Sequence, residues 1–386
     1  MKKIAVFTGT RAEYGLLSPL MRSLQEQPGV CLQVIVSGMH LAPQFGETWR
    51  VIESDGFAID AKVEMLLASD SACGVAKSIG VGVLGFADAL ERLQPECLVI
   101  LGDRYEALAI AQVAVVMRIP VAHIHGGEIT EGAYDDSIRH AISKLSHFHF
   151  VASDEYRRRV IQLGEAPSKV WNVGALGIEN IKTVPRLTLE QLNQEFGFEL
   201  NRPFVLVTYH PVTAGNEDSD ETFGNLLQAL DQFPEIQVLI TYPNSDNGGG
   251  RLIQCLEEYA EGRPGRVFTT PSLGLKGYLS AVSQCEVVIG NSSSGIIEVP
   301  SLDKPTVNIG VRQKGRLSAA SVIHTDDSLE NILEGIQLAL TPKFKKLSIA
   351  ALNPYGSGNT TQEIVGTLLA AGKQQAKVFF DLPVEN

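Results

Sequence analysis

The stretch from His123 to His140, HIHGGEITEGAYDDSIRH, places eight ionisable side chains within eighteen residues. It follows a short apolar run that closes at Val121–Ala122, and Gly126–Gly127 allow the backbone to turn. Asp135–Ser137 are typical of the first turn of a helix. Ligands of open α/β sheets bind beyond the carboxyl ends of the strands. We therefore predict that this stretch is an active-site loop.

Carboxylates follow two apolar segments and suit proton transfer. Asp103 ends the segment 97–101, and His125, Glu128 and Asp135 follow the segment 121–124. Two acids held close together cannot both ionise easily, so one can donate a proton while the other accepts one. Each aspartate alone is as well explained as a helix cap. The whole cluster favours acid–base chemistry.

The histidines of this stretch also suggest a metal site. None of them has H-E-x-x-H spacing, and His123 and His125 would point to opposite faces of a continuing strand. We therefore predict neither a bound metal nor a cofactor.

Two series of alternating strands and helices must position these residues. Strands are predicted over residues 4–7, 32–36, 97–101, 121–124, 148–152 and 170–173, and then over 204–208, 237–241, 267–269, 286–289 and 306–309. The repeated β-α order indicates parallel, doubly wound α/β sheets. The pattern loosens between residues 174 and 203, so the predicted domains are 1–180 and 181–359. A final helix within 360–380 has no strand of its own and can cross back onto the first domain.

Each predicted domain has a glycine-containing turn, after the strand 4–7 or 286–289, that resembles an anion-binding site. Residues 8–15, TGTRAEYG, lead from a strand into a helix whose N–H groups, with Arg11, would face an anion. The turn is not G-x-G-x-x-G, so NAD binding is disfavoured. In the second domain, residues 290–295, GNSSSG, would present hydroxyl and N–H groups to a phosphate. A plain serine-rich helix cap is the alternative.

Further polar residues follow strands of the second domain. Glu298 lies where a carboxylate can accept hydrogen bonds from two ribose hydroxyls, and His210 and Asn244 end neighbouring strands. The basic cluster 312–316, RQKGR, is better explained by a diphosphate than by a solvated turn.

Size and composition limit the class of protein. The 386 residues exceed the roughly 250–300 that one hydrophobic core supports. A net charge of −12 argues against nucleic-acid and membrane partners, and five scattered cysteines fit a reducing cytoplasm. The N-terminal apolar run is shorter than a signal sequence needs, and we expect no stretch of about 18 residues that spans a membrane. We therefore expect a soluble cytoplasmic protein.

Six ordered motifs together resemble the UDP-N-acetylglucosamine 2-epimerases, above all the hydrolysing branch that makes N-acetylmannosamine for sialic acid. They are residues 9–15, 102–104, 123–128, 135–140, 210–213 and 290–295, followed by Arg312 and Gln313. The resemblance implies two Rossmann-like domains of the GT-B type that face each other across a cleft, with UDP held mainly by the second domain and the sugar by the first. It also implies a homodimer or a dimer of dimers.

The resemblance also implies residue roles. Asp103, Glu128 and Asp135 correspond to the acid–base residues that carry out anti elimination of UDP to 2-acetamidoglucal and its hydration. His125 stands where many relatives have glutamate, so it or Glu128 must serve in proton transfer. The positions that would contact UDP are Arg11, Ala12, Arg104, His210, Asn244, Leu273, Ser292, Ser293, Glu298 and Arg312. Met39 replaces a glutamine of the non-hydrolysing enzymes, which favours the hydrolysing branch.

Four alternatives stay open on the sequence. The same chemistry can act on UDP-2,4-diacetamido-2,4,6-trideoxyglucose, in the legionaminic-acid pathway. A non-hydrolysing epimerase and a GT-B glycosyltransferase would use the same scaffold. A UDP-sugar-binding regulatory module is the non-catalytic alternative, and the ionisable groups around Asp135 disfavour it.

Overall fold

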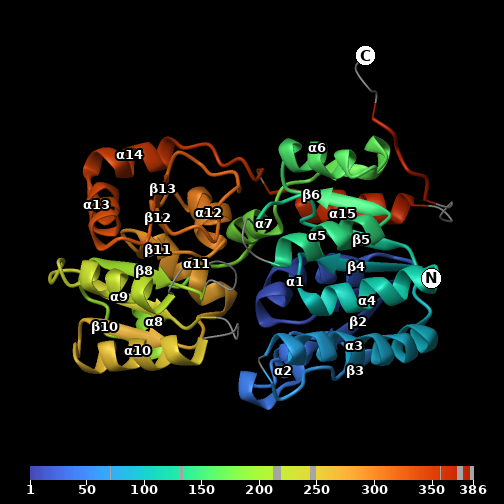
Figure 1. Cartoon of the computed structure of the whole chain (residues 1–386), viewed down its shortest axis with the longest axis horizontal. Coiled ribbons are helices and arrows are strands. Elements are labelled where there is room, and N and C mark those ends of the chain that lie inside the picture. Colours follow the sequence, from blue (N-terminus) through green and yellow to red (C-terminus); the bar gives the residue numbers. More distant parts are fainter. Residues whose placement is uncertain are drawn as a thin grey trace. The chain divides into compact units, whose positions relative to one another are not determined.

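Short apolar runs of the sequence form the strands of two parallel sheets (Figure 1). A computed structural model describes residues 1–69, 71–130, 134–211, 219–243, 249–356, 358–371 and 377–382. The chain divides into two compact units. Unit 1 comprises Met1–Glu128, Tyr134–Asn180 and Tyr355–Asn386, and unit 2 comprises Ile129–Ala133 and Ile181–Pro354.

The sheet of unit 1 has the strand order β3-β2-β1-β4-β5-β6-β7, and all neighbours are parallel. The strands are β1 (Lys2–Thr8), β2 (Val30–Ser37), β3 (Ala61–Val63), β4 (Cys97–Leu101), β5 (Val121–Ile124), β6 (Phe148–Val151) and β7 (Val170–Asn172). Six of them were predicted. The seventh, the short edge strand β3, was not predicted. The strand order reverses between β1 and β4, and ligands of such sheets bind at that point.

Helices cover both faces of this sheet. They are α1 (Arg11–Glu26), α2 (Trp49–Ser54), α3 (Ala72–Leu93), α4 (Tyr105–Val116), α5 (Tyr134–Leu145), α6 (Asp154–Gln162), α7 (Leu176–Thr183) and α15 (Thr360–Ala370). Apolar side chains of α1 and α15 share one core cluster, and those of α3 and α4 share another. The final helix therefore packs into the core of unit 1, because Ile364, Val365 and Leu368 are buried there.

Helix α3 passes the length and composition test for a membrane span, contrary to the expectation that no stretch would. Its 22 residues have a mean hydropathy of 1.4 over the tested window. One face of α3 packs against the sheet, where Phe86 and Leu90 are fully buried. Gly85 allows close approach: a Cβ at this position would lie 2.6 Å from Val63 of β3.

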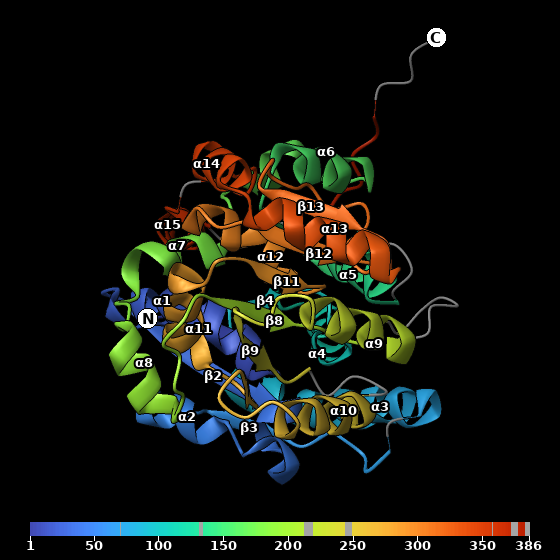
Figure 2. The same ribbon diagram turned by 90° about the vertical axis from the view of Figure 1, so that its left-hand side faces the viewer.

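Unit 2 repeats the architecture with the strand order β10-β9-β8-β11-β12-β13. Its strands are β8 (Phe204–Thr208), β9 (Gln237–Thr241), β10 (Val267–Thr270), β11 (Val288–Gly290), β12 (Thr306–Ile309) and β13 (Val322–Thr325). Figure 2 shows the succession from β9 through β8 and β11 to β13. The strand β13 was not predicted, because its residues are only partly buried and it lies at the sheet edge. The order reverses between β8 and β11.

The remaining helices of unit 2 are α8 (Leu189–Phe196), α9 (Ser219–Leu230), α10 (Gly249–Glu261), α11 (Gly274–Gln284), α12 (Ser294–Ile297), α13 (Leu329–Leu340) and α14 (Pro342–Ala350). Leu226, Leu256 and Ile332, from α9, α10 and α13, pack in one core against the sheet.

A buried carboxylate fastens the C-terminal segment to unit 1. Glu165 accepts hydrogen bonds from Nε2 of His149 at 3.0 Å and from Nζ of Lys144 at 2.9 Å. Nζ of Lys377 lies 2.8 Å from the same carboxylate and also donates to the carbonyl oxygens of Lys144 and Ser146. These three donors outweigh burial and lower the pKa of Glu165 to about 2.

This depressed pKa predicts how the stability of unit 1 depends on pH. The stabilisation by ionised Glu165 is complete above the unfolded pKa of about 4.5 and is lost as the pH falls through the folded pKa of about 2. We therefore expect the Lys377→Met variant to unfold more easily at pH 7, by about 1–2 kcal/mol, and to lose less stability on acidification. Denaturant titrations at pH 7 and pH 3 measure both effects. An equal loss on acidification in both proteins would contradict this role of Lys377.

Candidate functional site

The loop after β1 satisfies its own N–H groups. Thr10 and Glu13 form a capping box that begins α1 at Arg11, five residues before the predicted start. Oε2 of Glu13 accepts hydrogen bonds from the N–H groups of Gly9 at 2.7 Å and Thr10 at 3.1 Å. The sequence predicted that these N–H groups would bind an external anion. In the structure, the carboxylate of Glu13 accepts hydrogen bonds from the two N–H groups of Gly9 and Thr10 instead. Arg11 and Ala12 are exposed on the first turn.

The loop after β5 needs an unusual backbone. His125 adopts a left-handed conformation with φ of 65°, a region that histidine visits more readily than most residues. Gly127 has φ of 79°, and a Cβ there would lie 2.5 Å from the carbonyl oxygen of Tyr156 in α6. Nη1 of Arg159 donates to the carbonyl oxygen of Gly127 at 2.5 Å. Gly127 therefore lets this loop lie directly against α6, in the turn that the sequence predicted.

Within this loop, His125 and Glu128 form a buried pair. Nδ1 of His125 donates to Oε1 of Glu128 at 2.9 Å. Nε2 of His125 is buried and has no hydrogen-bond partner among the residues that the structure describes. With Nδ1 carrying the proton, Nε2 presents a lone pair. A carboxylate that orients an imidazole in this way is a common acid–base arrangement.

Arg139 joins the acidic residues of unit 1. Its side chain is only 1% exposed, and Nη2 donates to Oδ2 of Asp103. Nη1 donates to the carbonyl oxygen of Glu128 at 3.1 Å and lies 3.5 Å from Oδ1 of Asp136. The loops after β4 and β5 are thereby brought together with α5. Asp135 lies one residue into α5 and four residues before Arg139.

The structure argues against helix capping as the role of Asp103. The N-cap residue of α4 is Arg104, whose side chain makes no capping hydrogen bond. Arg104 instead donates to both carboxylate oxygens of buried Glu106, at 3.2 Å each. Next to Asp103, His123 is fully buried, donates to the carbonyl oxygen of Gly102 at 2.7 Å and accepts from Ser143 at 3.1 Å. Burial lowers the pKa of His123 to about 3, so it is neutral at pH 7.

In unit 2, Asn291 connects the loops at the point where the strand order reverses. It is fully buried directly after β11, and its side chain accepts from the N–H of His210 at 2.7 Å and donates to the carbonyl oxygen of His210 at 2.8 Å. The carbonyl oxygen of Asn291 accepts from Arg312 at 3.0 Å and from Gln313 at 2.9 Å. Three of the predicted segments therefore meet at one asparagine.

Other predicted residues of unit 2 follow its strands β10 and β11. Ser292 and Tyr278 hydrogen-bond to the hydroxyl of Ser294, at 3.2 and 2.5 Å. Leu273 is the buried N-cap residue of α11. Asn244 lies outside the described residues. Burial, with Arg312 nearby, lowers the pKa of His210 to about 3, so this imidazole is neutral at pH 7.

The sequence also predicts that a helix opens at residues 296–298, but the helix in the structure begins earlier and is short. α12 is a single turn that ends before Glu298, and a 3-10 helix, Val299–Leu302, follows. Pro300 explains this difference, because proline lacks the N–H group that would continue the helix. Glu298 is therefore the C-cap residue of α12 rather than a residue one turn inside a helix.

We expect Asn291→Ala to weaken unit 2 and, with it, the UDP binding that the motif resemblance implies for this unit. The change leaves an N–H and a carbonyl group of the His210 backbone buried without their partner, at a cost of about 1–3 kcal/mol each. Chemical denaturation measures this loss, and calorimetric titration measures the affinity for UDP, which should fall about tenfold. Asn225→Ala is a matched control, since Asn225 donates to one loop carbonyl, that of Asp327. An unchanged UDP affinity would show that Asn291 does not hold the binding loops.

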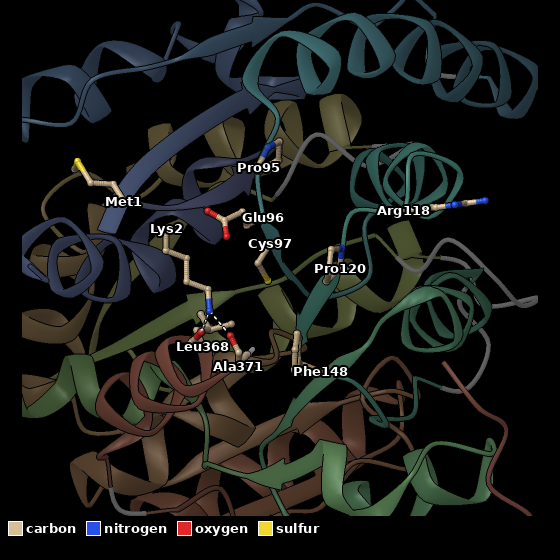
Figure 3. Close-up of a pocket in the computed structure, with 10 residues that line it drawn as sticks. All are labelled: Met1, Lys2, Pro95, Glu96, Cys97, Arg118, Pro120, Phe148, Leu368 and Ala371. Atoms are coloured by element: carbon tan, nitrogen blue, oxygen red, sulfur yellow. Dashed lines mark hydrogen bonds between the residues drawn. The ribbon is translucent and has the colours of Figure 1, made fainter. Parts of the chain in front are cut away.

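A pocket of about 710 Å³ lies in unit 1 at the amino ends of the strands (Figure 3). Its lining includes Lys2, Cys97 and Phe148, which begin β1, β4 and β6. The acidic residues follow the carboxyl ends of the strands, so this pocket is separate from them. Figure 3 shows Lys2 reaching to the carbonyl oxygens of Leu368 and Ala371, at 2.7 and 2.5 Å, where it satisfies the end of α15.

Comparison with known proteins decides the family. The family model described as UDP-N-acetylglucosamine 2-epimerase matches residues 22–369. The chain belongs to the UDP-N-acetylglucosamine 2-epimerase family. The resemblance that the motifs indicated is therefore confirmed.

Relatives within the family include hydrolysing enzymes. A GDP/UDP-N,N'-diacetylbacillosamine 2-epimerase (hydrolyzing) of Campylobacter jejuni is 38% identical over 345 residues, 89% of each chain. A UDP-N,N'-diacetylbacillosamine 2-epimerase (hydrolyzing) of Legionella pneumophila is 36% identical over 362 residues, 94% of each chain. Polysialic acid biosynthesis protein P7 of Escherichia coli is 36% identical and covers 99% of this chain and 98% of its own.

A solved structure confirms the fold. The UDP-GlcNAc 2-epimerase from Neisseria meningitidis bound to UDP-GlcNAc has a TM-score of 0.81 and 22% identity, and the match covers 96% of this chain and 100% of that chain. The predicted fold class, two doubly wound α/β domains of the GT-B type, is thus confirmed.

Sequence reasoning missed two residues that organise these sites, Arg139 and Asn291. Both lay inside stretches that had been singled out, but neither was given a role. The signal for Arg139 was available, because it stands three and four residues after Asp136 and Asp135 on a predicted helix. Nothing local in the sequence indicated that Asn291 would bind the backbone of a residue 81 positions earlier.

Proposed function

We propose that this chain is a hydrolysing 2-epimerase and that its substrate is UDP-N,N'-diacetylbacillosamine, a UDP-2,4-diacetamido-2,4,6-trideoxy sugar. The observation that carries the reaction is the joining of Asp103, Glu128 and His125 in unit 1 of a member of the 2-epimerase family. The names of two relatives at 38% and 36% identity support this sugar, which the sequence had offered as an alternative.

The proposed reaction begins with departure of UDP from C1. The C2 hydrogen has no carbonyl group next to it, so it becomes acidic only as positive charge develops at C1. UDP must therefore be stabilised first, and Arg312 with the hydroxyl and N–H groups of residues 292–294 can do so by preorganised electrostatics. Arg11, Ala12, Arg104, His210, Asn244, Leu273, Ser292, Ser293 and Glu298 remain the proposed further contacts of UDP.

Proton transfer completes the reaction. Loss of the C2 proton gives the 2-acetamidoglucal, and water then adds a hydroxyl group at C1 while a proton returns to the opposite face of C2. Asp103, Glu128 with His125, and Asp135 are the proposed acid–base residues, and each role is worth roughly 10²–10⁴-fold in rate. The products are the free 2-epimeric sugar and UDP.

UDP-N-acetylglucosamine is the second candidate substrate. The polysialic acid biosynthesis protein matches 99% of this chain, and the motif resemblance implies a product, N-acetylmannosamine, for sialic acid. The two sugars differ at C4 and C6, so the chemistry at C1 and C2 is the same for both. Only the relative kcat/KM can distinguish them.

Incubation with each UDP-sugar in deuterated water tests the proposal. We expect a free sugar of manno configuration, deuterated at C2 by NMR, and a kcat/KM for the diacetamido substrate at least about tenfold above that for UDP-N-acetylglucosamine. A higher kcat/KM for UDP-N-acetylglucosamine would instead identify that sugar nucleotide as the substrate. An epimerised sugar still joined to UDP would indicate a non-hydrolysing enzyme, and turnover only with an added acceptor would indicate a glycosyltransferase.

A further inference from the structure

Arg139 is a deeply buried cation beside the acidic residues of unit 1. It is 1% exposed, although it stands only five residues after the first residue of α5. A buried guanidinium is costly unless its N–H groups are satisfied. Those of Arg139 point to Asp103, to the Glu128 carbonyl group and to Asp136. The cation therefore lies where three separate acidic segments converge.

Asp103 and Arg139 are unequally buried, and this decides which of the two side chains can contact a substrate. The side chain of Asp103 is 26% exposed, whereas that of Arg139 is 1% exposed. A molecule that approaches from solvent reaches the carboxylate and not the guanidinium. Arg139 can therefore act on the reaction only through Asp103 and the loop that carries Glu128.

From this geometry we infer that Arg139 is a positioning residue, which fixes the orientation of Asp103 and keeps it ionised so that Asp103 is the group that accepts a proton. The inference rests on the proposed epimerase function. A cation at hydrogen-bond distance favours the carboxylate form, and the fork of N–H groups at the same time ties Asp103 to the loop after β5. The Glu128–His125 pair then remains for the other proton transfer.

In the part of the chain that the structure describes, other charged groups also lie near Asp103. They come from α4, β5 with its loop, and α5: Arg104 with its partner Glu106, His123, Glu128, Asp136 and Arg139. Arg104 is occupied by Glu106, and neutral His123 brings no charge at pH 7. Glu128 and Asp136 are acids, which favour protonation of Asp103. Loss of Arg139 would therefore remove the cation that donates to Asp103 and would leave the nearby acids Glu128 and Asp136 in place.

The pH dependence of kcat/KM for the whole chain tests this role. In Arg139→Gln, we expect the acidic limb of the profile to move up by about one pH unit and kcat to fall about tenfold. In Arg139→Lys, which keeps the charge but not the fork, the limb should stay near its original position while kcat is still reduced. Arg157→Gln is the matched control, because Arg157 holds only the carbonyl oxygens of Val170 and Pro167.

The outcomes separate the inference from the proposed function. If the unmodified chain shows no turnover of either UDP-sugar, the proposed function fails. If it turns over and folded Arg139→Gln has an unchanged acidic limb and kcat, the role of Arg139 is refuted alone. If circular dichroism shows that Arg139→Gln does not fold, the Arg139→Lys variant decides. A kcat equal to that of the unmodified chain would refute the role of Arg139. A reduced kcat with an unmoved acidic limb of the pH profile would support it.

Discussion

Asp103→Asn is expected to reduce turnover of the UDP-sugar at least ~10²-fold while UDP still binds with nearly unchanged affinity. Asparagine has almost the same shape as aspartate and can still accept a hydrogen bond from Arg139, but it cannot take up a proton. The loss should therefore appear in kcat rather than in the dissociation constant for UDP. Steady-state kinetics with calorimetric titration of UDP measure the two quantities.

Asp154→Asn provides a control for this substitution. Asp154 also belongs to unit 1, begins α6 and accepts one hydrogen bond from Asn172 at 3.1 Å, which an asparagine can keep. It should leave kcat within about twofold, the normal range for an exposed position. Near-normal turnover of Asp103→Asn would remove Asp103 from the chemistry.

Gly290→Ala is expected to destabilise unit 2 by about 4 kcal/mol, the sum of backbone strain and a steric clash. Gly290 has φ of 136°, which side chains rarely allow, and a Cβ would lie 2.0 Å from the carbonyl oxygen of Thr208. Thr208 is its register partner on β8, so the clash is between two strand backbones and no side chain can move to relieve it. Chemical denaturation measures the loss.

Gly224→Ala is the matched substitution in the same unit. Gly224 lies within α9, and a Cβ there would meet nothing within 4 Å. Alanine is the better helix former, so stability should rise by up to ~1 kcal/mol. If Gly290→Ala were as stable as Gly224→Ala, unit 2 would not depend on the close backbone contact of β11 with β8 at Gly290.

The sequence by itself determined the elements, because their signals are local. The strands at 97–101, 121–124, 204–208, 237–241 and 306–309 have the predicted bounds, and the final helix, Thr360–Ala370, lies within the predicted range 360–380. Each apolar run has the length and flanking turn residues of its element, and tertiary contacts did not override them. Motif order alone also indicated the 2-epimerase family, which the family match confirmed.

Only the tertiary structure decided how the polar residues are paired. Glu13 occupies the N–H groups that the first turn had offered to an anion, Arg139 holds Asp103, and Asn291 holds the backbone of His210. The last two bonds join residues 36 and 81 positions apart. Such pairs form because buried polar groups must be satisfied once the strands bring their ends together, and that requirement does not appear in any local stretch of the sequence.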